Sequence, residues 1–228
     1  MNKTAVILFA NLPELEARAK SFSNYSSQKA TQQISKVLTQ HFYQLAKQSS
    51  ADTFLIDSRV QKGKNFADRI TNAFNETYAK GYENVICIGN DCPSLTINQL
   101  ENAIYQTEKG KIVLGPTEDG GAYLIGLPKI YFNKVAFTNI KWQSKKTYQD
   151  LKNIFSSTKS NVVETETLSD LDNPEDILNA KNKTIVTKLI TQLILNFSNI
   201  YNEKVFQTII DYVKVDSSSL KSPPAFSI

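Results

Sequence analysis

The residues best suited to chemistry lie in a polar turn around Asp91. This turn, Asn-Asp-Cys-Pro-Ser at 90–94, directly follows the apolar run 84–89. An aspartate at the end of a buried strand can hold a divalent cation, because Mg²⁺ is commonly bound by one or two carboxylates together with water and substrate phosphates. Aspartate is also favoured in Asx-turns and at helix caps. We favour the metal site and keep the structural turn as the alternative.

A second acidic turn carries Glu118, Asp119, Gly120 and Gly121. Adjacent glycines let a backbone approach a ligand closely or adopt positive φ, and the two carboxylates add negative charge. The same composition is also that of an ordinary turn. Spacing alone does not separate a binding loop from a plain connection here.

The elements that must position these turns alternate along the chain. Apolar runs at 4–10, 53–56, 84–89 and 112–114 predict strands, and apolar stripes at helical spacing predict helices over 29–47, 66–78 and 96–107. Such alternation predicts an α/β fold with a mostly parallel sheet and right-handed crossovers. In such sheets the ligand crevice lies at the carboxyl ends of the strands, where both acidic turns are expected.

The rest of the chain divides into the end of this domain and an extension. An apolar run at 122–127, a helix over 145–155 and a short strand at 162–163 complete the main domain, which we place at 1–183. The extension, 184–228, has apolar helical stripes at 185–197 and 205–213 and a Ser/Pro-rich tail from Ser217. Its two helices could cap the core, form a homodimer interface or hold another partner.

Composition narrows the class of protein. The formal charge of +4 over 228 residues is too small to indicate a nucleic-acid surface. Cys87 and Cys92 match neither a redox nor a zinc spacing, and no apolar run is long enough to span a membrane. The first residues suit a buried strand better than a signal peptide. We therefore expect a cytoplasmic protein with reduced cysteines.

The two acidic turns and their flanks resemble the DUF2064 family, a branch of the GT-A-fold glycosyltransferases related to molybdopterin-cofactor and phospholactate nucleotidyltransferases. The matching segments read Gly-Asn-Asp-Cys-Pro-Ser-Leu at 89–95 and Leu-Gly-Pro-Thr-Glu-Asp-Gly-Gly-Ala-Tyr-Leu-Ile-Gly-Leu at 114–127, with further matches at 63–69, 141–144 and 170–176. The resemblance covers about residues 4 to 180. It implies a three-layer αβα, Rossmann-like GT-A (nucleotide-diphospho-sugar transferase) fold with a mostly parallel sheet, followed by the C-terminal helical extension.

The same resemblance implies a Mg²⁺- or Mn²⁺-assisted transfer. Asp91 would contact the metal that bridges a nucleotide's phosphates, and Asp119 would act on the acceptor or sugar side. Asp172 would be a second acid near the metal, although an acid before Asn-Pro is also typical of a helix start. The other implied contacts are Ala10, Asn11, Arg18, Lys20 and Asn90 for the nucleotide, and Glu118, Gly120, Gly121 and Trp142 for the substrate. Trp142 could equally fill the core.

The first loop departs from the family pattern. Members usually continue after the first strand with a Gly-x-x-Lys-Thr-Arg-like stretch that receives phosphates. In direct register this chain has Glu16, Ala19 and Ser21 at the glycine, lysine and arginine positions, and Glu14 adds a further acid. Carboxylates repel phosphate, whereas the long side chains of the neighbouring Arg18 and Lys20 could reach it.

Three functions agree with these observations. The first is a metal-dependent glycosyltransferase with a nucleotide-sugar donor and an unknown small-molecule acceptor. The second is a nucleotidyltransferase that joins an NTP to a phosphorylated small molecule, since one fold and one metal site can serve both reactions. The third is a non-catalytic nucleotide-binding or interaction protein, which the altered first loop would explain.

Overall fold

The computed structural model describes residues 3–20, 28–155 and 161–172, together with the single positions 176, 188, 190, 191 and 193. The chain forms two compact units. The first contains 1–12 and 41–171, and the second contains 13–40 and 172–228. The helices predicted at 185–197 and 205–213 and the tail from Ser217 lie outside the described residues, apart from helical positions 188, 190, 191 and 193.

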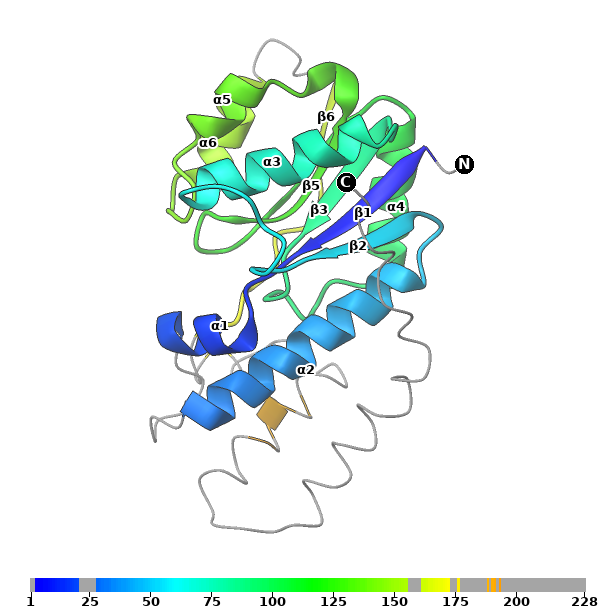
Figure 1. The fold of residues 1–228 in the computed structure, drawn as a ribbon. Helices are drawn as coiled ribbons and strands as arrows, with labels where there is room; N and C mark the ends of the chain where they lie inside the picture. Colours follow the sequence, from blue (N-terminus) through cyan, green and yellow to red (C-terminus); the bar gives the residue numbers. More distant parts are fainter. Residues whose placement is uncertain are drawn as a thin grey trace. The chain divides into compact units, whose positions relative to one another are not determined.

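A six-stranded sheet forms the centre of the first unit (Figure 1). Its strands stand in the order β2-β1-β3-β5-β4-β6. In chain order they are β1 (Thr4–Phe9), β2 (Asp52–Ile56), β3 (Asn84–Ile88), β4 (Ile112–Pro116), β5 (Ala122–Pro128) and β6 (Val162–Glu164). The apolar runs seen in the sequence therefore became strands, as predicted.

The sheet is mostly parallel, as predicted, and β5 is the exception. Strand β1 pairs in parallel with β2 and β3, and β4 pairs in parallel with β6, whereas β5 is antiparallel to both β3 and β4. Strand β5 therefore starts at the edge of the sheet where β3 and β4 end. The turns after β3, between β4 and β5, and after β6 all meet at this carboxyl edge.

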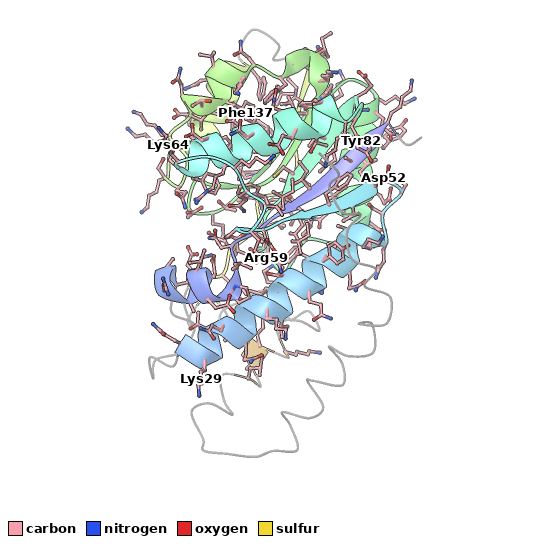
Figure 2. All side chains as sticks on the ribbon, viewed as in Figure 1. Lys29, Asp52, Arg59, Lys64, Tyr82 and Phe137 are labelled. Atoms are coloured by element: carbon pink, nitrogen blue, oxygen red, sulfur yellow. The ribbon has the colours of Figure 1, made fainter. Side chains whose placement is uncertain are left out.

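Helices cover both faces of the sheet. Helix α3 (Phe66–Ala79), α5 (Lys134–Thr138) and α6 (Thr147–Ile154) pack on one face, where Phe74 and Phe137 lie in the same apolar cluster as Ile7 and Val85 of the sheet. Figure 2 labels Phe137 in this layer. Helix α4 (Ile97–Glu108) packs against β3, β4 and β5 on the other face. The helices α5 and η1 (Lys129–Tyr131) were not predicted.

The local sequence explains where the two long crossover helices of this unit begin. Asn65 caps α3 by accepting a hydrogen bond from Asp68 N at 2.8 Å. Thr96 and Gln99 form a reciprocal capping box at the start of α4, and this helix runs one residue further than the predicted 96–107. Both helices begin on the carboxyl side of a strand, as βαβ crossovers require.

The second unit holds α1 (Pro13–Ala19) and α2 (Gln28–Lys47) up to Gln40. The segment expected as a phosphate-binding loop is thus helix α1. Its signals are Pro13 at the first helical position and acidic Glu14 and Glu16 in the first turn. Across the described ranges, no helix has the length and apolar character needed to cross a membrane.

Candidate functional site

The turn at 117–121 connects β4 to β5 and is built around Asp119. Asp119 Oδ1 accepts hydrogen bonds from the Thr117 hydroxyl and from Gly121 N, the latter at 2.9 Å. Thr117 N donates to Gly121 O at 3.1 Å and closes the turn. One oxygen of Asp119 therefore holds a structural turn, and the role of this segment in binding stays a prediction.

Gly120 is required by this turn for two reasons. Its φ is +94°, a conformation that side chains with a Cβ rarely adopt. A Cβ at this position would also lie 2.3 Å from the carbonyl oxygen of Lys145. The turn is therefore pressed against the backbone before α6, and Tyr148 N donates to Gly120 O at 3.0 Å.

The segment after β6 runs alongside this turn and positions Asp170. Leu168 N donates to Pro116 O and Glu118 N donates to Leu168 O, each at 3.1 Å. The Ser169 hydroxyl donates to Glu118 Oε2 at 2.7 Å. These bonds extend the parallel pairing of β4 and β6 beyond the strands, so that residues 168–170 lie beside residues 116–119.

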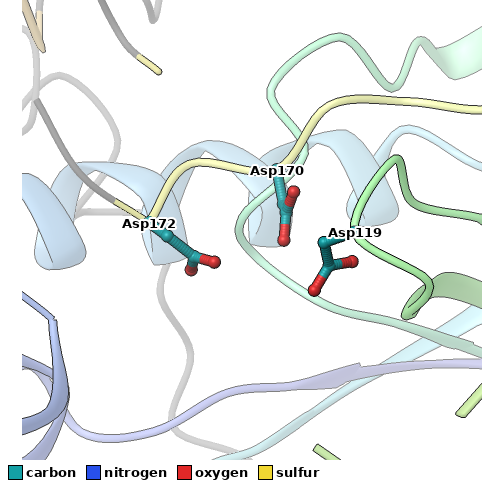
Figure 3. Close-up of side chains that lie close together, drawn as sticks. All are labelled: Asp119, Asp170 and Asp172. Carbon is teal, nitrogen blue, oxygen red and sulfur yellow. The ribbon is translucent and has the colours of Figure 1, made fainter. Parts of the chain in front are cut away.

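An acidic group results at the carboxyl edge of the sheet. Asp119 and Asp170, which both belong to the first unit, each offer a carboxylate oxygen, and these oxygens lie within 4.8 Å of each other (Figure 3). Close carboxylates repel one another, and a cation between them removes that cost.

Asp91 lies in the neighbouring turn, at the end of β3. Its backbone carbonyl accepts a hydrogen bond from Leu171 N at 2.8 Å, which ties the turn to the segment of Asp170. Its Oδ1 is 3.8 Å from Cys92 Sγ. Asp91 is half-buried. Its role as a metal ligand stays a prediction.

The predicted phosphate contact Lys20 is engaged by carboxylates within the second unit. Its Nζ lies 2.7 Å from Asp172 Oδ1 and 3.5 Å from Glu16 Oε1. This pairing explains how Glu16 is tolerated at 9% exposure. Arg18 is exposed on α1, and Ser21 lies outside the described residues.

Other predicted contacts occupy defined places in the first unit. The Ala10 carbonyl accepts a hydrogen bond from Gln61 Nε2 at 2.9 Å. Trp142 is partly buried against the apolar cluster, 5.8 Å from the rings of Phe66 and Phe137, and donates its indole N–H to Phe137 O at 2.8 Å. Its contact with substrate stays a prediction. Asn11 and Asn90 are half-buried at the ends of β1 and β3.

Sequence reasoning missed Asp170 as a site residue. In the sequence it is only the first residue of the matching segment 170–176, Asp-Leu-Asp-Asn-Pro-Glu-Asp. An available signal was the alternation of Asp170 and Asp172 around the buried Leu171, since an extended segment places such residues on one side. The sequence does not show that this segment lies beside the turn of Asp119, because the two are about 50 residues apart along the chain.

The sheet order and the helices on both faces define a GT-A-like, Rossmann-type α/β fold with a mostly parallel sheet. A putative nucleotide-diphospho-sugar transferase from Desulfovibrio desulfuricans G20 has the same fold, with a TM-score of 0.73, 18% identity and coverage of 91% of this chain and 98% of that one. CMP:2-keto-3-deoxy-manno-octonic acid synthetase complexed with CTP matches with a TM-score of 0.50, 10% identity and coverage of 83% and 99%.

The family follows from the sequence. A family model described as "Uncharacterized protein conserved in bacteria (DUF2064)" matches residues 26–144, which is more than half of the chain. The chain therefore belongs to the DUF2064 family, as its motifs indicated. No protein of curated function matches the sequence.

Proposed function

We propose that this protein is a divalent-metal-dependent transferase that uses a nucleotide-sugar donor. The observation that carries the proposal is the pair Asp119 and Asp170 at the carboxyl edge of the sheet, where α/β proteins of this type bind ligands. The fold shared with a protein described as a nucleotide-diphospho-sugar transferase supports the choice of ligand. Asp91, in the adjacent turn, is a further proposed ligand.

The residues of the acidic group fit Mg²⁺ or Mn²⁺. Both ions take oxygen ligands, and Mg²⁺ holds them at about 2.0–2.1 Å, so opposite ligands stand about 4.2 Å apart. The carboxylate oxygens of Asp119 and Asp170 already lie within 4.8 Å of each other, and small side-chain rotations would complete the geometry. Asp119 can take part without opening its turn, because only its Oδ1 is used there.

Each acidic residue has a distinct task in this proposal. Asp119 is held rigidly by Thr117 and Gly121 and presents its second oxygen, while Asp170 is held by the pairing of the 168–170 segment with β4. A cation bound there would act as a Lewis acid and neutralise the charge of the diphosphate leaving group. The protein's own contribution is to keep the two carboxylates in place before the ligand arrives.

Thermal unfolding against a panel of ligands tests the proposal. The panel contains UDP-, GDP- and TDP-sugars and free NTPs, each with and without Mn²⁺. A ligand at 100 times its dissociation constant adds about 2.7 kcal/mol, which corresponds to several degrees for a chain of this size. We expect a nucleotide-sugar to stabilise the protein only when metal is present. Selection of an NTP instead would indicate nucleotidyl transfer.

The variants Asp119→Asn, Asp170→Asn and Asp91→Asn locate the metal. Asparagine at 119 can still accept the bonds from Thr117 and Gly121, so the turn survives while the charge is lost. Asp52→Asn, at the opposite edge of the sheet, is the matched control, because an asparagine at this position could still accept the hydrogen bond from Tyr82. We expect Asp119→Asn and Asp170→Asn to abolish the metal-dependent shift. If no nucleotide shifts the folded wild type, the proposal fails.

A further inference from the structure

The chain from Gly120 to Gln149 has an unusual charge. It contains no acidic residue, and it carries lysines at 129, 134, 141, 145 and 146. These five charges exceed the formal charge of the whole chain, which is +4. Three of them, Lys141, Lys145 and Lys146, fall within the connection between α5 and α6. We call the segment 141–147 the lysine loop.

The lysine loop is fixed beside the acidic group. The carbonyl oxygen of Lys145 lies 2.3 Å from the position that a Cβ on Gly120 would take, and Tyr148 N donates to Gly120 O at 3.0 Å. Gly120 is the direct neighbour of Asp119. All these residues belong to the first unit, so the loop and the Asp119 turn are packed together within it.

The loop is ordered by its own hydrogen bonds. The hydroxyls of Ser144 and Thr147 both donate to Lys141 O, at 2.6 and 3.0 Å, and Lys141 N donates to Asp150 Oδ2 at 3.0 Å. Gln143 has a φ of 55°, in the left-handed region that non-glycine residues seldom enter. Such a conformation costs free energy and persists where the surroundings hold it, commonly at ligand sites.

Other lysines of the first unit form ion pairs with carboxylates. Lys152 pairs with Glu164 at 2.8 Å and Lys62 pairs with Glu76 at 3.1 Å. Across the described ranges, no ion pair involves Lys141, Lys145 or Lys146, and all three are exposed. The carboxylate that does bond to the loop, that of Asp150, accepts from a backbone N–H and leaves the ammonium groups unused.

The start of α6 does not itself offer a backbone anion site. Thr147 N donates to Ser144 O and Tyr148 N donates to Gly120 O, so these two amides are already used. An anion would therefore be held by the ammonium groups, which act as flexible point charges for phosphate.

We propose that the lysine loop binds the anionic group, a phosphate by our assignment, of the acceptor substrate. This inference rests on the proposed transferase function and names the acceptor class: a phosphorylated small molecule placed on the β5–α6 side of the metal site. Positive charge beside the acidic group would attract such an acceptor and orient it toward the donor.

The test is an NMR titration of the ¹⁵N-labelled protein with inorganic phosphate at constant ionic strength. We expect saturable shifts of the backbone amides of residues 141–147. In the double variant Lys145→Gln/Lys146→Gln, phosphate should bind about fivefold or more weakly, since each exposed charge pair contributes up to about 1 kcal/mol. The control Lys129→Gln/Lys134→Gln removes the same charge from η1 and α5, outside the loop, and should bind phosphate as the wild type does.

Three outcomes would overturn the inference. They are the absence of saturable shifts in the loop, equal weakening in the control variant, and displacement of phosphate by the nucleoside diphosphate of whichever donor stabilises the protein. The last outcome would mean that the lysines hold the donor. If a donor binds in the presence of metal but phosphate does not shift the loop amides, only this inference is contradicted. If no nucleotide of the panel binds, the transferase proposal is contradicted.

Discussion

Gly120 shows how a single residue holds the candidate site together. Its positive φ and its contact with the Lys145 carbonyl are separate requirements, and Gly81 has only the first. Gly81 has a φ of +98°, and a Cβ there would meet no heavy atom within 4 Å. The two glycines therefore form a matched pair.

We predict that Gly120→Ala destabilises the protein more than Gly81→Ala does. The left-handed conformation costs about 1–2 kcal/mol with a Cβ in either case. The clash with Lys145 should add about 1–3 kcal/mol, because backbone atoms must shift. Urea unfolding of the two variants and the wild type measures the difference. Equal losses in the free energy of unfolding would show that the loop before α6 moves away from the added Cβ at no cost in stability.

Asp119 is the residue where structure and proposed chemistry coincide. The turn uses Oδ1, and we propose that the second oxygen contacts the metal. An alanine at this position would therefore damage both, whereas asparagine separates them. This is why the asparagine variant is the informative one for the metal.

At the scale of the elements, Glu164 joins β6 to α6. Its carboxylate accepts hydrogen bonds from Lys152 Nζ at 2.8 Å and from the hydroxyl of Tyr148. These two partners, Lys152 first, lower the pKa of Glu164 below its usual value of 4.5. Burial and the same carboxylate raise the pKa of Tyr148. The contacts fix helix α6, and hence the lysine loop, to the edge of the sheet.

The lowered pKa of Glu164 predicts a contribution to stability that depends on pH. A carboxyl group with a depressed pKa in the folded state stabilises the fold above its unfolded pKa, and this contribution is lost as the pH falls through the folded value. We expect Glu164→Gln to be less stable than the wild type at pH 7 and the gap to close below about pH 4.5. Chemical unfolding at several pH values measures the gap. A gap that is independent of pH would contradict the assignment.

At the scale of the molecule, the first unit is discontinuous in sequence. Strand β1 lies between β2 and β3, so residues 4–9 pair with segments that follow about 45 and 80 residues later. Contacts of such separation must be formed against the entropy of closing long loops. The sheet, and with it the acidic edge, depends on the correct insertion of β1.

Ile7→Asp should therefore unfold the first unit. Ile7 is 0% exposed in the central strand, and an unpaired buried carboxylate costs several kcal/mol, which is comparable to the stability of a whole domain. Val60→Asp is the control, because Val60 is 42% exposed after β2. Near-UV circular dichroism compares the two. A native spectrum for Ile7→Asp would mean that β1 is not essential to the core.

Much of this architecture could be predicted from the sequence because the signals are local. Short apolar runs became the strands, and the caps Asn65 and Thr96 mark the helix starts. The acidic turns at Asp91 and Asp119 were expected at the carboxyl edge, because that edge follows from the alternation of strands and helices. The family also follows from contiguous motifs.

Only the tertiary structure decided which acids meet. Asp170 joins Asp119 because β6 pairs with β4, and Lys20 meets Asp172 across roughly 150 residues of sequence. Likewise, the contact between Gly120 and Lys145 brings the acidic turn and the lysine loop together. Strand order and side-chain encounters between distant segments depend on packing of the whole chain, and no local pattern of residues encodes them.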